Sequence, residues 1–213
     1  MVFHVKPDDD GRRPLPPLPA VDAATEAKLE AFLELLVRWN GRINLVADRD
    51  PETIRTRHIA DSLQLLPLVP PGGGPMADLG SGGGFPGLVL AIATGRETHL
   101  VESDRRKAAF LIEAAARLGL DRVRIHSRRI EAATLPPVAV LTARALAPLV
   151  ELLPHAARFL APSGVAIFPK GRSAEDELTN ALRGWHLQVE RFASRTDPHA
   201  TIFRLSELRG PDA

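Results

Sequence analysis

The stretch MADLGSGGGFPGLVLAIA, residues 76–93, constrains the fold of this chain more than any other segment. It places five glycines within eight residues, between two apolar runs. Glycine loses more conformational freedom on folding than any other residue, so such a cluster marks a sharp turn or a close approach of a ligand to the backbone. The apolar run before it predicts a short strand, and the run after it predicts a helix. The glycines therefore lie at a strand-to-helix junction.

Length and composition limit the class of protein. A chain of 213 residues can form one full-sized core, and its 45% hydrophobic and 25% charged residues are ordinary for a globular protein. It has no cysteine, which excludes disulfides and thiolate metal sites, and we expect no metal. No apolar stretch reaches the length of a membrane span, and the N-terminus lacks the apolar centre of a signal peptide. We expect a cytoplasmic monomer with no membrane partner.

Basic residues are unevenly distributed. Between Ser103 and Ile130 there are eight Arg or Lys residues and only three acidic residues. A second basic region upstream contains Arg38, Arg42, Arg49, Arg55 and Arg57, followed by His58. Such charges often lie on solvated faces, and that interpretation stays open. Two basic regions on either side of one glycine turn also fit a polyanionic partner.

The first seventy residues predict a tail followed by helices. Residues 1–20 hold five prolines and an acidic triplet, which predicts a mobile, disordered tail. Apolar residues recur with a helical period over residues 22–39. The Asp50-Pro51 pair has the residue types of an N-cap and a first helical position, so we expect a second helix there. Together the helices predict a small cap over residues 21–70, closed by the chain break VPPGGGP.

The rest of the chain, residues 71–213, alternates strand and helix patterns. This alternation predicts parallel strands joined by right-handed crossovers, an α/β fold with a doubly wound sheet. Two final runs, 186–192 and 200–205, predict an antiparallel hairpin around the turn TDPH. The strands are expected at 76–79, 98–102, 123–127, 138–142 and 164–169, and the helices at 88–93, 105–118, 149–160 and 174–182.

Two features of the sheet predict a nucleoside-bearing cofactor. In a doubly wound sheet the first strand-to-helix turn cradles the ligand, so Gly80, Gly82 and Gly84 are candidate binding residues. Glu102 lies 22 residues beyond Gly80, at the end of the next predicted strand. A carboxylate there can accept hydrogen bonds from both hydroxyls of a ribose. A glycine loop that serves only as a tight turn remains the alternative for this segment.

The spacing of the glycines discriminates between cofactors. The dinucleotide fingerprint requires a glycine where this chain has Phe85, and no Lys-Ser or Lys-Thr follows the glycines as in a P-loop. The pattern present is D-x-G-x-G-x-G, beginning at Asp78. It resembles the first motif of S-adenosylmethionine-dependent methyltransferases.

Five segments in order resemble one family, the bacterial small-subunit ribosomal RNA guanine-N7 methyltransferases, also called glucose-inhibited division protein B. The resemblance covers about residues 40–182, and the segments are WNGRINLVADRDPETIRTRHIADSL, DLGSGGGFPGLVLAI, VESDRRKAAFL, TARALAPL and PKGR. The resemblance implies methyl transfer from S-adenosylmethionine to N7 of a guanine in small-subunit ribosomal RNA, as naked RNA or in the ribosomal subunit. It implies a Rossmann-like class I methyltransferase sheet over residues 71–213.

The resemblance also assigns residues. It implies that Gly80 and Phe85 belong to the cofactor loop, that Ile130 and Glu131 meet the adenine, and that Glu102 binds the ribose. Arg144 matches an arginine at the cofactor site, and its position after the strand at 138–142 places it at the carboxyl edge of the sheet; an ordinary surface ion pair is the alternative. For RNA contacts the candidates are Arg57, His58, Lys170 and Arg172, each of which could instead be a solvated or packed residue.

Guanine N7 carries an exposed lone pair and is unprotonated at neutral pH, so it needs no general base. Catalysis then depends on positioning and electrostatics, and we assign no catalytic residue beyond an assisting role for Arg144. Three alternatives stay open: a small-molecule methyltransferase, a nicotinamide oxidoreductase, which Phe85 disfavours, and a non-catalytic RNA-binding module.

Overall fold

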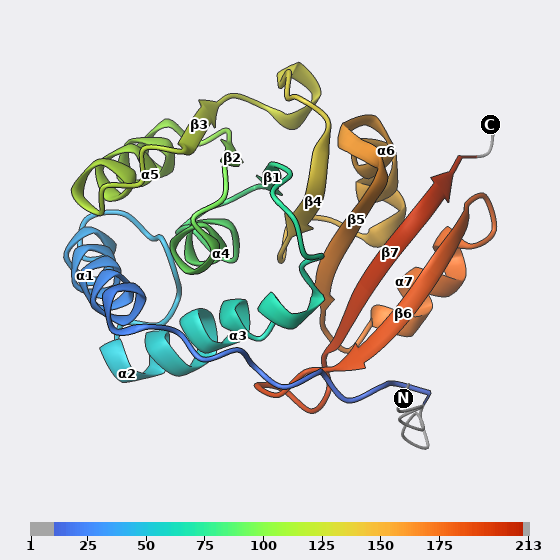
Figure 1. The fold of residues 1–213 in the computed structure, drawn as a ribbon, viewed down its shortest axis with the longest axis horizontal. Helices are drawn as coiled ribbons and strands as arrows, with labels where there is room; N and C mark the ends of the chain where they lie inside the picture. Colours follow the sequence, from blue (N-terminus) through green and yellow to red (C-terminus); the bar gives the residue numbers. More distant parts are fainter. Residues whose placement is uncertain (1–10, 211–213) are drawn as a thin grey trace.

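A computed structural model describes residues 11–210 of the chain. Its centre is a seven-stranded sheet of order β3-β2-β1-β4-β5-β7-β6 (Figure 1). Strands β1 to β5 pair in parallel, whereas β7 is antiparallel to both β5 and β6. This confirms the doubly wound sheet with a C-terminal hairpin. The strands are β1 (Met76–Leu79), β2 (Thr98–Glu102), β3 (Val123–Ser127), β4 (Val138–Ala143), β5 (Leu160–Lys170), β6 (His186–Ala193) and β7 (Thr201–Arg209).

The main differences from the predicted boundaries lie in the C-terminal half. Strand β5 begins at Leu160 rather than Gly164, directly after a helix, and β7 continues to Arg209 rather than ending at Leu205. The β5 extension contains Pro162, which disfavours a strand prediction, and the β7 extension runs through mostly polar residues, where hydropathy gives little signal; strand pairing decides both ends.

Helices cover both faces of the sheet (Figure 1). On one face lie α1 (Ala23–Asn40), α4 (Gly87–Thr94) and α5 (Arg105–Arg117), and α1 contacts both of the others. On the other face lie α6 (Leu149–Phe159) and α7 (Ala174–Ala181). One apolar cluster includes Phe32 of α1, Leu88 of α4 and Phe110 of α5. The N-terminal helices of the expected cap therefore share a core with the sheet domain.

The second predicted helix is a continuous run of three elements. Asp50 caps its start, accepting a hydrogen bond from the Thr53 N–H at 2.8 Å. The helical run then consists of α2 (Pro51–Ile54), the π-helical segment η1 (Arg55–Ile59) and α3 (Ala60–Leu63). Single π turns within helices occur frequently at functional sites, and this one carries Arg57 and His58.

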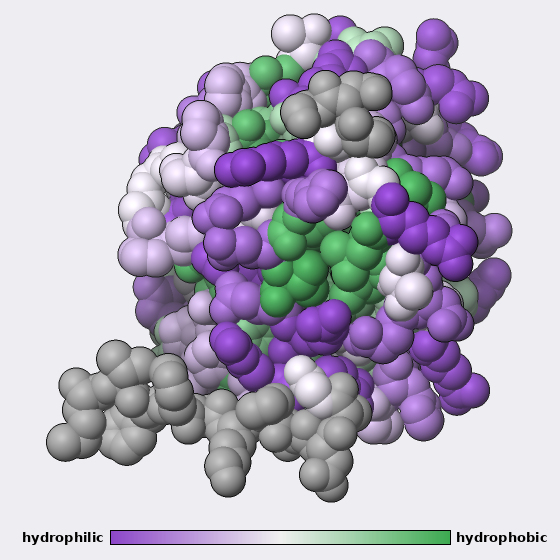
Figure 2. All heavy atoms as spheres, turned by 90° about the vertical axis from the view of Figure 1, so that its right-hand side faces the viewer, coloured by the Kyte–Doolittle hydropathy of each residue, from purple (hydrophilic) through white to green (hydrophobic). Residues whose placement is uncertain are grey.

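Residues 11–20 pack against the rest of the protein, in contrast to the mobile tail predicted for residues 1–20. They cross the carboxyl end of the edge strand β6, where Arg13 pairs with Phe192, and continue toward α1, as Figure 1 shows in dark blue. The Arg13 N–H donates to the Arg191 carbonyl at 2.8 Å, and Leu15 is 7% exposed within an apolar cluster. Burial of Leu15 and pairing with an open strand edge explain this course; residues 1–10 of the predicted tail lie outside the described range. Figure 2 views this end of the molecule, where a small apolar area is enclosed by hydrophilic side chains.

Candidate functional site

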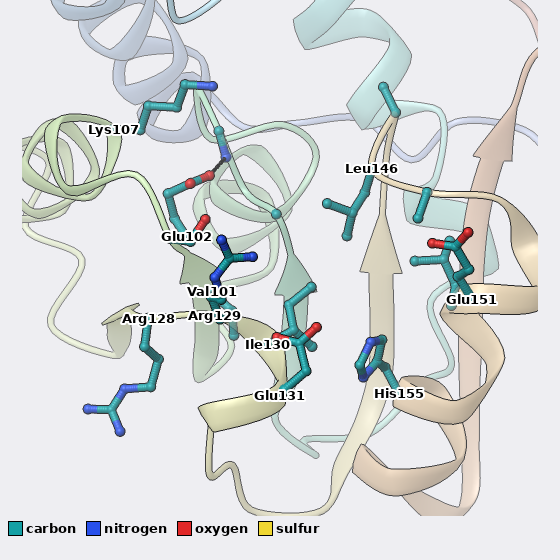
Figure 3. A pocket seen from close by; sticks show the side chains of 16 residues that line it. Val101, Glu102, Lys107, Arg128, Arg129, Ile130, Glu131, Leu146, Glu151 and His155 are labelled. Carbon is teal, nitrogen blue, oxygen red and sulfur yellow. Dashed lines mark hydrogen bonds between the residues drawn. The ribbon is translucent and has the colours of Figure 1, made fainter.

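A first cavity, of about 390 Å³, opens at the carboxyl ends of the parallel strands. Gly80 and Gly82 line it after β1, Glu102 at the end of β2, and the turn η3 (Ile130–Ala132) after β3. Figure 3 shows Glu102 and Leu146 reaching into it from opposite walls. Parallel strands bring their carboxyl ends to one edge, which is where doubly wound sheets bind ligands.

The glycine turn fixes the carboxylate of Glu102. Its Oε2 accepts a hydrogen bond from the Gly82 N–H at 2.8 Å, and its Oε1 accepts one from the Asp104 N–H at 2.7 Å. The residue is only 7% exposed. Each carboxylate oxygen has a second lone pair, so the group can still accept hydrogen bonds from two ligand hydroxyls.

The glycines differ in what they do. Gly80 and Gly82 have φ of +68° and +53° and line the first cavity, so the turn itself requires left-handed backbone. Gly84 also has positive φ, but a Cβ there would lie 3.1 Å from Leu88 and 3.2 Å from Phe32. Gly84 thus packs behind the turn and does not line the cavity.

Further side chains complete the first cavity. Ile130 and Glu131 line it as the resemblance implies, together with Lys107, Arg128 and Arg129 from the basic region between Ser103 and Ile130. Sequence reasoning did not single out Glu151 and His155, which reach the cavity from α6. They belong to an amphipathic helix whose period gives no hint of a ligand.

Asp78 lies beneath the glycine turn and is wholly buried. Its Oδ1 accepts a hydrogen bond from the Thr142 hydroxyl at 2.6 Å, whereas Oδ2 is buried without a partner among the described residues. Burial raises the pKa of Asp78 to about 6, against the opposing effect of Thr142. A Cβ on Gly87 would approach the Asp78 Cβ to 2.4 Å, so this glycine makes room for the carboxyl group.

A second cavity, of about 780 Å³, adjoins the first. The two share Ala145, Leu146 and Ala147, the residues that follow Arg144 in the loop after β4. Ala145 has a φ of +50°, uncommon for a residue with a side chain. Leu146 lies over Gly80, where a Cβ would be 2.6 Å from one of its methyl groups. Leu146 therefore forms an apolar partition between the cavities.

Arg144 lies in the wall of the second cavity and is absent from that of the first. Its Nη1 donates to Asp61 Oδ2 at 3.0 Å, and its Nη2 lies 3.1 Å from His58 Nδ1. The guanidinium carbon is 5.2 Å from the centre of the Phe85 ring. Phe85, 4% exposed, therefore packs against the Arg144 guanidinium and does not line the first cavity.

The same contacts define the state of His58. Because arginine can only donate, Nδ1 of His58 accepts, and neutral His58 then donates from Nε2 to Asp48 Oδ2 at 3.0 Å. Burial lowers the pKa of His58, and Arg144 lowers it further, against the opposite effect of Asp48. His58 also stacks on Phe85, with ring centres 5.2 Å apart. Both ring nitrogens are therefore engaged.

The other RNA candidates lie in different surroundings. Arg57 lines the second cavity with its side chain 70% exposed. The Lys170 side chain is only 9% exposed and donates to the Ala147 carbonyl at 2.6 Å and to Glu177 at 2.9 Å. Arg172 is exposed and lines neither cavity. Nothing in the sequence indicated that Lys170 pairs with groups inside the protein.

The first cavity fits S-adenosylmethionine. Glu102 presents a fixed acceptor suited to ribose hydroxyls, Ile130 and Glu131 offer an apolar and a polar contact for a base, and the Gly80–Gly82 turn admits a ligand close to the backbone. When bound, the cofactor supplies an electrophilic methyl group. Fold and cavity together define a class I methyltransferase that uses S-adenosylmethionine.

Solved structures share this fold. A glycopeptide N-methyltransferase complexed with S-adenosylmethionine matches with a TM-score of 0.57 and 14% identity, covering 70% of this chain and 93% of that one. A ribosomal protein L11 methylase from Lactobacillus delbrueckii matches with a TM-score of 0.56 and 17% identity, covering 70% and 78%.

Within this class, the chain belongs to the GidB family, rRNA small subunit methyltransferase G, whose model matches residues 25–199. The ribosomal RNA small subunit methyltransferase G of Granulibacter bethesdensis is 56% identical over 97% of this chain and 99% of its own length. That of Rhodospirillum centenum is 52% identical over 88% and 87%. The family recognised in the sequence is confirmed.

The described residues, 11–210, contain neither a membrane-spanning helix nor a cluster of metal ligands. No helix in that range is long and apolar enough to cross a membrane. Within the same range, no group of three or more His, Cys, Asp or Glu residues could hold a metal ion.

Proposed function

We propose that this protein transfers the methyl group of S-adenosylmethionine to N7 of a guanine in small-subunit ribosomal RNA, with the acceptor base in the second cavity. The observation that carries the proposal is the shared wall, Ala145 to Ala147. A base in the second cavity and a methyl donor in the first would be separated only by the Leu146 partition. The names of the relatives support ribosomal RNA as the substrate.

The side chains of the second cavity support a mechanism of positioning. Guanine N7 attacks through its own lone pair, so no residue has to remove a proton. His58, the titratable ring in the wall, is neutral and has both nitrogens engaged, which makes it a poor base but a rigid support for Arg144. The preorganised Arg144 can donate to a base carbonyl without reorganising during the reaction.

Apolar and charged groups have separate roles in the proposal. Attack by N7 requires direct contact with the methyl carbon, so the Leu146 side chain, which is 39% exposed, has to be displaced from between the two ligands when both are bound. We assign contacts with RNA phosphates to Arg57 and Arg172, and their exposure supports this role. Lys170 instead fixes the loop that carries Leu146, through its bond to the Ala147 carbonyl.

The decisive experiment uses small ribosomal subunits, and free ribosomal RNA, from a strain that lacks this protein. The purified protein and S-adenosylmethionine labelled in the methyl group should label the RNA, and borohydride reduction with aniline cleavage should map N7-methylguanine to one nucleotide. Label on another atom would disprove guanine N7 as the acceptor. Label on small metabolites but never on RNA would favour a small-molecule methyltransferase, and RNA binding without methyl transfer would favour a binding module.

Localisation and assembly belong to the same proposal. Ribosomal subunits are cytoplasmic in bacteria, so the proposed substrate places the protein in the cytoplasm. We further propose that it acts as a monomer. Sedimentation at working concentration tests this, and a stable dimer would contradict it.

A further inference from the structure

One wall of the second cavity comes from the far end of the chain. The turn between β6 and β7, residues 194–200, contributes Thr196, Asp197, Pro198 and Ala200 to the lining. Along the chain, this turn comes about fifty residues after the loop that carries Arg144. It belongs to the antiparallel hairpin β6–β7 at the edge of the parallel sheet. The position of the turn therefore sets the shape of the cavity.

Gln64, the residue that directly follows α3, holds this turn through hydrogen bonds. It is 2% exposed, and its amide oxygen accepts hydrogen bonds from the Arg195 N–H at 2.8 Å and the Ser194 hydroxyl at 3.3 Å. Its amide nitrogen lies 3.1 Å from the hydroxyl oxygens of both Ser194 and Thr196, and 2.7 Å from Asp61 Oδ1. A buried amide with this many partners has one orientation and resists displacement.

Asp61 joins this cluster to Arg144. Its Oδ1 accepts hydrogen bonds from the Gln64 amide and, at 2.7 Å, from the Thr196 hydroxyl. Its Oδ2 accepts the hydrogen bond from Arg144. A continuous series of polar contacts thus runs from the turn through Gln64 and Asp61 to the guanidinium that faces the cavity.

The N-terminal segment holds the other side of the turn. Arg195 donates from Nη2 to the carbonyls of Leu15 and Pro16 at 3.0 and 2.6 Å. Arg12 donates from Nη1 to the carbonyls of Pro198 and Ala200 at 3.2 and 3.1 Å. The turn is therefore clamped between α3 and residues 12–16.

We propose that Gln64 is a positioning residue for the acceptor nucleotide, because it fixes the β6–β7 turn against the Asp61–Arg144 pair in the wall of the second cavity. The inference rests on the proposed function, in which the second cavity receives that nucleotide. A loose turn would have to be ordered each time RNA binds, and that entropic cost would weaken RNA binding while leaving the first cavity intact.

The test compares variants on the same assay. Gln64→Ala removes the side chain that links the turn to Asp61. Thr196→Val removes the hydroxyl that contacts Asp61, Gln64 and Ser194, and because Thr196 is exposed, folding is not at risk. Thr196→Ser keeps that hydroxyl, and Gln188→Ala changes an exposed glutamine of β6 as the matched control. Steady-state methylation of small subunits gives kcat and KM, and calorimetry gives the Kd of S-adenosylhomocysteine.

We expect a KM for the RNA substrate about tenfold higher in Gln64→Ala and several-fold higher in Thr196→Val, with the cofactor Kd and kcat within twofold of wild type. Thr196→Ser and Gln188→Ala should match wild type. Wild-type KM in both of the first two variants would overturn the inference, and so would parallel changes in cofactor Kd and KM, which indicate a merely structural role. A wild-type protein that fails to methylate RNA would instead overturn the proposed function, and the inference with it.

Discussion

The two cavities are neighbours, yet they are built by different means. Turns that directly follow three consecutive parallel strands form most of the first, with Glu102 held by two backbone N–H groups. Side-chain contacts between distant segments form the second, such as Asp61 with Arg144 and Gln64 with Thr196. Backbone geometry thus determines the first cavity, and a polar side-chain network determines the second.

The difference has a functional consequence. Because the first cavity depends on the sheet itself, changes there should affect cofactor binding and leave RNA contacts in place. Changes in the polar network of the second cavity should weaken RNA binding and leave cofactor binding unchanged. Four predictions follow from this comparison, in order of decreasing expected effect.

The largest effect is expected from Gly82→Val. A left-handed φ costs an L-residue about 1–2 kcal/mol, and a β-branched side chain costs more and would extend toward the ligand. We expect calorimetry to show no measurable binding of S-adenosylhomocysteine by a folded protein. Gly95→Val is the control, because Gly95 has a φ of +62° with open space around it, at the end of α4. It should lose stability and keep its affinity; normal cofactor binding by Gly82→Val would show that the ligand does not approach this turn.

Glu102→Gln should have the next largest effect. A charged hydrogen-bond acceptor contributes about 1.5–3 kcal/mol, so the cofactor should bind roughly 10- to 150-fold more weakly. RNA affinity, measured by filter binding in the presence of excess cofactor product, should stay near wild type. Glu113→Gln, on the surface of α5, is the matched control. An unchanged Kd for S-adenosylhomocysteine would remove Glu102 from the cofactor site.

Lys170→Met and Arg172→Met should show that a buried cation contributes to stability, whereas an exposed cation contributes to RNA binding. The first leaves the partly buried Glu177 carboxylate without its cationic partner, so the free energy of unfolding should fall by about 1–3 kcal/mol. The second should leave stability unchanged and flatten the salt dependence of RNA binding by about one unit of slope, as should Arg57→Met. Thermal melts and binding across a salt series measure both effects. If Lys170→Met changed the slope without changing stability, the lysine would contact RNA directly.

The smallest effect concerns pH. The folded pKa of His58 is lowered, chiefly by burial, so the folded state binds fewer protons than the unfolded state and stability is lost as pH falls below about 6.5. His58→Gln cannot be protonated, so its loss of stability between pH 7 and 5 should be smaller than in wild type. Urea titrations at several pH values measure this, with the exposed His186→Gln as control. A steeper loss in His58→Gln would contradict the neutral state assigned to His58.

The sequence predicted the frame because its signals are local. Alternating apolar runs predicted the sheet and most helix positions, the D-x-G-x-G-x-G pattern predicted the class of cofactor, and the family resemblance is confirmed. It also assigned Gly80, Gly82, Glu102, Ile130 and Glu131 to one site, and the structure brings these five to one cavity. Residues at the ends of successive parallel strands must meet at one edge, so chain order alone places them together.

Only the tertiary structure decided which way other residues face. Arg144 follows β4 as predicted, but Asp61 and His58 turn it toward the second cavity, and Phe85 lies beneath it. Lys170 is paired internally, and Arg13 pairs with the edge strand β6 although the composition of residues 1–20 predicts mobility. Gln64 meets Thr196 from 132 positions away. Contacts of this kind depend on which distant segments pack together. A single polar residue leaves no periodic pattern in the sequence from which its partner could be predicted.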